Sequence, residues 1–138
     1  MGPSEVLCFA GVALFLLGLL NGFAIPRLRS PRLGLSAHLT AVQSGTFLIA
    51  VGLLWPRLAL DPTWSAVLAN GLWISLHMVW ASLLLAGAFG AGQGLPIAGG
   101  GITTTPGRQR LVTVLLAAGS LGCLAAVAAV LVLWHWRG

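Results

Sequence analysis

The chain has very few charged side chains, no lysine and no tyrosine. Only 7% of its 138 residues are charged, whereas a soluble domain has about 25%. Its two acidic residues, Glu5 and Asp61, both sit at the ends of predicted helices. The sequence therefore offers no carboxylate pair for acid–base catalysis. An enzyme built from this chain would rely on histidine and on a borrowed metal or cofactor.

Cysteine is equally scarce. Cys8 and Cys123 lie in different apolar runs, and no Cys-x-x-Cys or other metal-binding spacing is present. Both are predicted to be packing residues. The net charge of +5 does not indicate nucleic-acid binding, because the arginines are spread over the helix ends and form no basic stripe.

The sequence contains long apolar runs. Hydrophobic residues make up 58% of the chain, and four runs are near or above the ~20 residues that cross a bilayer as a helix. The predicted spans are residues 5–25, 33–55, 63–89 and 108–134. Backbone polar groups in lipid must be satisfied within the protein, so helices are the expected form. We predict an all-α integral membrane protein, with residues 1–138 forming a single four-helix transmembrane domain.

The arginines predict how this bundle is oriented. The first and third connections hold five arginines and the opposite side holds two: Arg27, Arg29, Arg32, Arg108 and Arg110 against Arg57 and Arg137. Positive charge accumulates on cytoplasmic loops, so these two connections are predicted to be cytoplasmic, with both termini outside. The expected location is the cell inner membrane, as a multi-pass protein.

Small residues at four-residue spacing predict close helix packing in two places. Gly18 and Gly22 share a face of the first helix, and Ala118, Gly122 and Ala126 share a face of the fourth. Small residues at this spacing let helix backbones approach each other. Either set alone is explained by packing within the bundle, and the two together leave room for self-association.

The third connection, "GAGQGLPIAGGGITTTPG", is rich in glycine and proline, which prevent a regular helix. Long connections in compact proteins are often functional. This segment is therefore either a flexible linker or a folded cap that closes over a site.

A histidine lies inside the second span. His38 stands among Ser36, Thr40, Gln43 and Ser44, and an ionisable group at membrane depth is a candidate functional residue. At helical spacing, its face of the helix carries mostly small residues, namely Ala41, Val42, Gly45, Ile49 and Gly52. This face could bind a metal and make room for a flat ligand. The alternative is a histidine that hydrogen-bonds across helices.

The third span carries a second group of polar and aromatic residues. Asn70, Trp73, His77 and Trp80 are spaced three, four and three residues apart, so they form one stripe along a helix. An aromatic-walled pocket with one histidine and one amide would suit a flat aromatic substrate. The alternative is tryptophan packing, with His77 hydrogen-bonded to a neighbouring group.

Either histidine arrangement is compatible with haem. A single axial histidine leaves the opposite iron position open for chemistry, whereas two facing histidines close both positions and suit electron transfer. The sequence permits His38 alone or His38 together with His77.

Most of the chain resembles the hydroxylaminobenzene mutases. The similarity is carried by "GFAIPRLRSPRLGLSAHLTAVQSGTFLIAVGLLWPRL" at residues 22–58, by "PIAGGG" at residues 96–101 and by the closing "LVLW…RG". It covers nearly the whole chain and keeps four helices. Ala37 and His38, followed after six residues by Gly45 and then an apolar run, are also distantly similar to the styrene oxide isomerases.

The resemblance implies an isomerase. Hydroxylaminobenzene mutases convert an arylhydroxylamine to an ortho-aminophenol by moving hydroxyl from nitrogen to a ring carbon. Styrene oxide isomerases convert an aryl epoxide to an aldehyde, and they are small membrane enzymes that assemble as trimers and hold haem b. Both reactions profit from a Lewis acid on the leaving atom. By this resemblance, His38 matches the haem-ligating histidine and Gly45 matches the glycine seven residues on.

The chain departs from the styrene oxide isomerases at two points. Ser44 stands where those enzymes have an asparagine before the glycine, and the tyrosine that they use near the substrate is missing. His77 matches no family role. An aryl epoxide or another N-hydroxy compound therefore stands as an alternative to an arylhydroxylamine.

These observations predict a haem b-dependent membrane isomerase that acts on a small aromatic substrate. Its expected partners are membrane lipid and further copies of itself, most simply as a trimer, with no nucleic acid. The competing interpretations are a non-catalytic bis-histidine membrane cytochrome and a cofactor-free structural or transport protein.

The expected roles of the site residues follow from this interpretation. His38 would bind iron, while Ser36, Thr40 or a backbone carbonyl would orient its other ring nitrogen. His77 would carry a proton, since imidazole exchanges one near neutral pH. The remaining candidates are Gln43 and Ser44 as hydrogen-bond partners of substrate or haem edge, Gly45 as room for porphyrin or a helix, and Asn70, Trp73 and Trp80 as pocket walls.

Overall fold

The protein is all-helical in the computed structural model, which describes residues 1–135. The elements, in chain order, are α1 (Pro3–Ala24), η1 (Ile25–Arg27), α2 (Pro31–Leu54), η2 (Trp55–Leu58), α3 (Pro62–Phe89), α4 (Pro96–Gly99) and α5 (Pro106–His135). Four of these helices are long and apolar enough to cross a membrane. The four predicted helices are therefore present, and their composition is that of a multi-pass membrane protein.

The helix boundaries follow from local chemistry. Each of the four long helices begins at a proline: Pro3, Pro31, Pro62 and Pro106. Proline at the first helical position sacrifices no helical hydrogen bond, and its φ is preset for a helix. For this reason each helix starts one or two residues before the predicted spans at 5, 33, 63 and 108. The Asp61 carboxylate also caps α3 by accepting a 2.9 Å hydrogen bond from Thr63 N.

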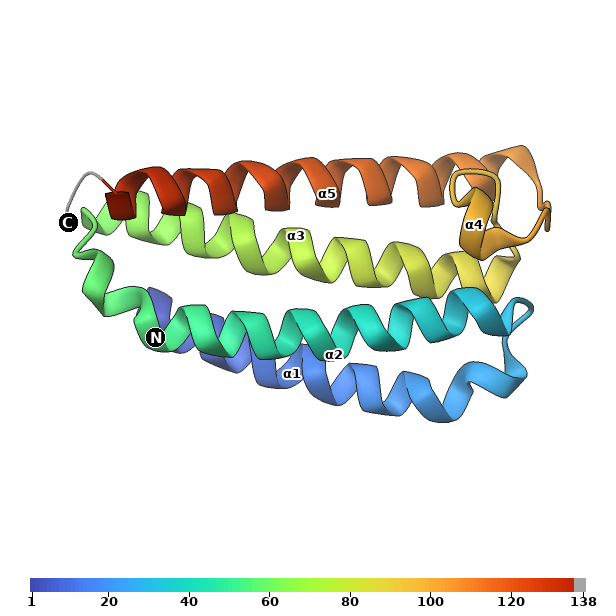
Figure 1. Ribbon diagram of the computed structural model, residues 1–138, viewed down its shortest axis with the longest axis horizontal. Coiled ribbons are helices and arrows are strands. Elements are labelled where there is room, and N and C mark those ends of the chain that lie inside the picture. The colour runs from blue at the N-terminus through green and yellow to red at the C-terminus, as the bar shows by residue number, and fades with distance from the viewer. Residues whose placement is uncertain (136–138) are drawn as a thin grey trace.

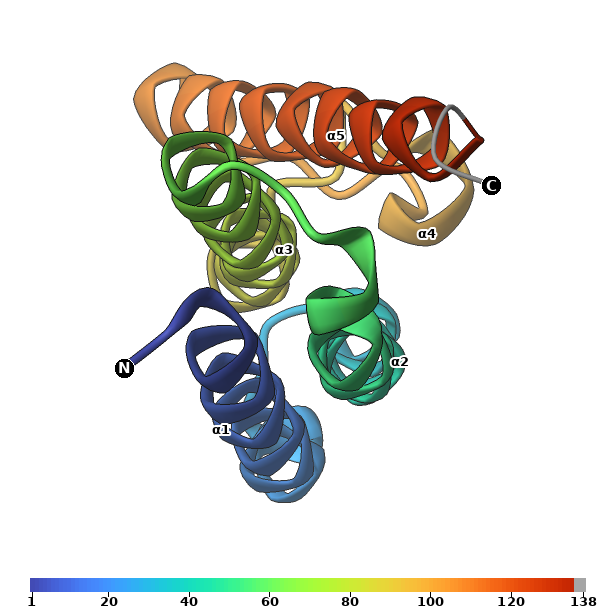
Figure 2. The same ribbon diagram turned by 90° about the vertical axis from the view of Figure 1, so that its left-hand side faces the viewer.

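The helices are arranged in order across the molecule. α1 and α2 form an antiparallel pair, and α3 lies between this pair and α5 (Figures 1 and 2). The N-terminus and the end of α5 lie at the same end of the bundle, as predicted for two pairs of spans (Figure 1). The outer surface of α5 exposes large apolar side chains, including Leu111, Val114, Leu121, Leu124, Leu131 and Val132. Such a surface suits lipid or another protein chain.

Two clusters of buried side chains hold the bundle together. The larger cluster runs through α1, α2 and α3 and includes Leu7, Leu14, Leu48 and Leu72. The smaller cluster lies at the other end and consists of Leu33, Ala86, Ala91 and Val112. The second cluster joins α2, α3 and α5 to the third connection.

The third connection is folded and is called the cap below, while its closure over a site stays a prediction. Gly92 N donates to Ile102 O at 3.2 Å, and the Gly92 and Gly99 backbones touch. The prediction that glycine and proline prevent any regular helix here is wrong, because the single turn α4 forms within the cap. The cap packs onto the Leu33 cluster, away from α1 (Figure 2).

One glycine of each small-residue seam packs inside the chain. A Cβ at Gly18 would lie 2.8 Å from Cβ of Ala41 on α2, and a Cβ at Gly122 would clash with the Ser75 hydroxyl on α3. Ala118 is exposed. The seams therefore stabilise the bundle itself, and they carry no argument for self-association.

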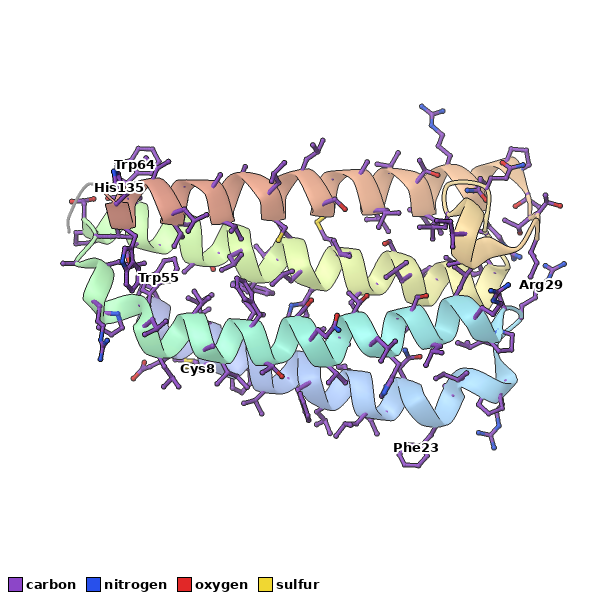
Figure 3. All side chains as sticks on the ribbon, in the orientation of Figure 1. Cys8, Phe23, Arg29, Trp55, Trp64 and His135 are labelled. Atoms are coloured by element: carbon purple, nitrogen blue, oxygen red, sulfur yellow. The ribbon has the colours of Figure 1, made fainter. Side chains whose placement is uncertain are left out.

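The ends of the bundle differ in composition. Arg29 lies at the end that carries the cap, and Trp55, Trp64 and His135 gather at the opposite end (Figure 3). Trp55 Nε1 donates to the Ser65 hydroxyl there at 2.8 Å. Arg137, which contributed to the orientation argument, and the closing Arg137 and Gly138 of the family resemblance lie outside the described residues.

Candidate active site

His38 is held by a carbonyl of the neighbouring helix. Its Nδ1 lies 2.7 Å from the carbonyl oxygen of Gly18 on α1. A carbonyl can only accept, so Nδ1 carries a proton, and in the neutral imidazole Nε2 then keeps a lone pair. The acceptor is the backbone carbonyl that the sequence left as one alternative, since the Ser36 hydroxyl donates to Arg32 O instead. His38 is half-buried and presents a nitrogen that is ready to bind a metal.

Asn21 is a buried polar residue between α1 and α2 that sequence reasoning missed. Only 5% of it is exposed, and its Nδ2 donates to Gly34 O on α2 at 3.2 Å. Its Oδ1 is buried without a hydrogen-bond partner among the described residues. The sequence feature that could have pointed to Asn21 is an amide within an apolar run. It follows Gly18 by three residues and therefore lies on nearly the same helical face.

Gly45 lies against α1 and leaves no room for a porphyrin at that position. A Cβ there would lie 2.7 Å from both Gly11 O and Phe15 N. Of the two roles that the sequence left open, the structure uses Gly45 for the approach of a helix.

Gln43 and Ser44 are not beside the His38 ring. On α2 they follow His38 by five and six residues, which turns them about 140° and 120° away from it in opposite directions. Gln43 is exposed and Ser44 is half-buried. Contacts from these side chains to substrate or haem would need a ligand or a second copy beside that part of α2.

The stripe on α3 is a connected group. Trp73 Nε1 donates to Asn70 Oδ1 at 2.9 Å, and His77 Nδ1 donates to Trp73 O at 2.8 Å. The Trp73 and His77 rings meet edge to face, with centroids 5.4 Å apart. As at His38, the proton is on Nδ1 and the lone pair is on Nε2.

A groove between α1 and α3 lies beside this group. It has a volume of about 280 Å³ and is lined by Met1, Val6, Phe9, Ala10, Ala13, Trp73 and His77. Its apolar walls and single imidazole would suit a small aromatic molecule with one polar group. Trp80 is not among the lining residues, because it packs against the larger core cluster, where its indole N–H is buried.

The two histidines of one chain lie on different faces of α1. His38 contacts Gly18, whereas the groove at His77 is lined by Phe9 and Ala13. Phe9 is turned about 180° from Gly18 around the helix, and Ala13 is about 7.5 Å from Gly18 along it. Two axial ligands must face each other across one iron. A single chain therefore does not place both histidines on one haem.

The similarity to known proteins now identifies the family. The model of the styrene oxide isomerase family matches residues 3–136. The chain belongs to the styrene oxide isomerase family. The similarity to styrene oxide isomerases that the sequence indicated is thereby confirmed.

Two relatives of this styrene oxide isomerase family member are hydroxylaminobenzene mutases from Ectopseudomonas oleovorans. HabB is 45% identical over 129 residues, which cover 92% of this chain and 77% of HabB. HabA is 41% identical over 108 residues, which cover 78% of this chain and 80% of HabA. No solved structure matches the chain. The family and these relatives establish that the protein is an isomerase.

The residues around His38 fit the haem b that the family resemblance implies. Its Nε2 is the free nitrogen of an imidazole whose Nδ1–H is hydrogen-bonded, the usual arrangement of a metal-binding histidine. Among residues 1–135, no three His, Cys, Asp or Glu side chains cluster to hold a metal ion. A metal bound by His38 would therefore bring most of its other ligands with it, as a porphyrin does.

Proposed function

We propose that this isomerase converts an arylhydroxylamine to an ortho-aminophenol in the cell inner membrane, with haem b bound through His38. In this reaction the N–O bond breaks, a ring C–O bond forms and one ring proton moves to nitrogen, so no net oxidation occurs. The two mutases, which cover most of the chain, support this choice of substrate.

The observation that carries the cofactor proposal is the 2.7 Å hydrogen bond from His38 Nδ1 to Gly18 O. It directs the Nε2 lone pair away from α1 and makes the imidazole a better electron donor. When bound, haem iron supplies a Lewis acid for the oxygen that leaves nitrogen. The chain supplies the orientation of this ligand through the bond to Gly18 O.

His77 is proposed to move the proton. Its Nε2 is the acceptor beside a groove that can hold an aryl ring, and the edge of Trp73 fixes the plane of its imidazole. It would accept the proton from the ring carbon and return it to nitrogen. Asn70 keeps the Trp73 wall in place through the indole hydrogen bond.

The proposal includes a homo-oligomer, taken as a trimer from the family resemblance. His38 and His77 of one chain face different sides of α1, so one chain alone does not assemble them around one substrate. We place the His38 surface of one copy against the His77 groove of the next, which is a head-to-tail interface that can close into a ring. Phe9, at the rim of the groove, is 69% exposed and available for such a contact.

Isomerisation of an aryl epoxide is the second candidate function, and the match to the styrene oxide isomerase family favours it. Assays with hydroxylaminobenzene and with styrene oxide, using the same preparation, would rank the two. A higher kcat/KM for the epoxide would reassign the substrate and leave the roles of the histidines unchanged.

Substitution of the two histidines tests the proposal. We expect His38→Ala to lose the Soret absorbance and the activity together, because the iron loses its protein ligand. We expect His77→Ala to keep the haem and lose about 100- to 10,000-fold in rate, the usual contribution of general acid–base catalysis. His135→Ala, at the far end of α5, is the matched control.

A normal haem content in His38→Ala would show that the axial assignment is wrong. A low-spin wild-type spectrum that becomes high-spin in His77→Ala would instead identify a bis-histidine cytochrome.

A further inference from the structure

Gly18 and Gly22 resemble a helix-packing pair, but their surroundings differ. A Cβ at Gly18 would lie 2.8 Å from Cβ of Ala41 and 3.1 Å from N of Val42, so this glycine is needed for α1 to approach α2. A Cβ at Gly22 would lie 3.2 Å from Nδ1 and 3.3 Å from Cε1 of His38. Within the described part of the chain, no other neighbouring group comes within 4 Å of that position.

The space at Gly22 is therefore occupied by the His38 ring. The ring lies flat enough against α1 to place Nδ1 2.7 Å from Gly18 O, one turn earlier on the same helix. Asn21 forms a second bond between the two helices in the reverse direction, from its Nδ2 to Gly34 O, one turn before His38 on α2. Together these two bonds limit both sliding and rotation of α1 against α2 at the histidine.

We propose that Gly22 is a positioning residue for His38. By lacking a side chain, it lets the imidazole reach the Gly18 carbonyl, and that contact keeps the proton on Nδ1 and the lone pair on Nε2. The effect of Gly22 on haem binding rests on the proposed function. Its effect on the position and tautomer of the His38 ring does not. A methyl group at Gly22 would push the ring outward by a few tenths of an ångström and lengthen the bond to Gly18.

The test compares Gly22→Ala with Gly71→Ala in the full-length chain. Gly71 is also inside a helix, and a Cβ there would meet no neighbouring group within 4 Å among the described residues. We expect both variants to melt at or above the wild-type temperature, because alanine forms helix more readily than glycine. We expect Gly22→Ala alone to release haem faster, by at most the ~10- to 100-fold in affinity that follows when the hydrogen-bond partner of a metal-binding histidine is lost, because the bond is lengthened and not removed.

Two spectroscopic measurements separate positioning from general stability. In haem-loaded protein, the iron–histidine stretching frequency should fall in Gly22→Ala, because a weaker bond at Nδ1 makes the imidazole a poorer electron donor. In chains that carry no haem, the ¹⁵N shifts of the His38 ring should move from the Nδ1–H form toward a mixture of tautomers. Gly18→Ala should differ from both variants by lowering the melting temperature, since it separates the helices.

Wild-type ring shifts and haem release in Gly22→Ala would overturn the proposal. If His38→Ala keeps its haem, the proposed function fails, and the ring shifts of haem-free Gly22→Ala still decide the role of Gly22. If His38→Ala loses haem while Gly22→Ala behaves as wild type, the proposed function stands and the positioning role is rejected.

Discussion

His38 and His77 present the same nitrogen for different structural reasons. Both rings donate from Nδ1 to a backbone carbonyl, at 2.7 Å and 2.8 Å. For His77 the acceptor is Trp73 O, one turn earlier in its own helix, so the arrangement depends on α3 alone. For His38 the acceptor is Gly18 O on another helix, so the arrangement depends on how α1 packs. Changes in α1 should therefore disturb His38 more than His77.

At this scale, Trp73→Phe tests whether the indole N–H shapes the substrate groove. Phenylalanine keeps an aromatic wall but removes the donor of the 2.9 Å bond to Asn70 Oδ1. We expect KM to rise about two- to tenfold, which corresponds to the ~0.5–1.5 kcal/mol of one hydrogen bond. Haem content should not change. Steady-state kinetics measures the effect, and Trp64→Phe, outside the groove, is the control. An unchanged KM would remove Trp73 from the substrate site.

The α1–α2 pair is the element that supports the proposed cofactor ligand. The two helices approach each other at Gly11 and Gly45, at Gly18 and Ala41, and at Cys8 and Gly52. At each of these three levels a glycine lets its helix come close to the backbone or to a small side chain of the other helix. Backbone proximity of this kind is what allows a carbonyl of α1 to reach a ring on α2.

The element-scale prediction is that Gly45→Ala destabilises the chain itself. Its methyl group would lie 2.7 Å from Gly11 O and from Phe15 N, both backbone atoms that cannot move aside separately. Overpacking of this kind costs about 1–3 kcal/mol, and the separation of the helices should also lower haem retention. Thermal denaturation in mild detergent measures the effect against Gly71→Ala. Wild-type stability in Gly45→Ala would contradict the tight α1–α2 contact.

At the scale of the whole molecule, α1 divides two surfaces that carry the candidate chemistry. One holds His38 beside Gly22, and the other is the groove at His77. The folded cap packs at the Leu33 cluster and not on α1. Any cover over the His38 ring therefore has to come from lipid, from a bound group or from a second copy.

A mixing experiment tests whether copies complete each other. Co-expression of His38→Ala and His77→Ala chains at equal levels should restore activity to about one quarter of wild type, because an active head-to-tail interface needs one intact face from each copy. If the mixture is no more active than either variant alone, both residues belong to the site of a single chain. Light scattering on the wild type in detergent would determine the number of copies, expected to be three.

The sequence by itself determined the class of fold and the chemistry that is available. Four apolar runs of sufficient length, opened by prolines, specify four long helices, because helix length and start signals are local properties. The scarcity of carboxylates indicated that an enzyme built from this chain would borrow a cofactor, and the family resemblance implied an isomerase. The spacing of Asn70, Trp73 and His77 also indicated a connected stripe, since these three residues meet within a single helix.

Only the tertiary structure decided which faces meet. Helical periodicity placed His38 and Gly45 on one face of α2, but it did not show that α1 fills the space at Gly45 or that Gly18 supplies the acceptor. It also did not show that His38 and His77 lie on different sides of α1, nor that Asn21 bonds to Gly34. The physical reason is that periodicity describes the face of one helix, whereas the partner of that face depends on the packing of segments distant in sequence.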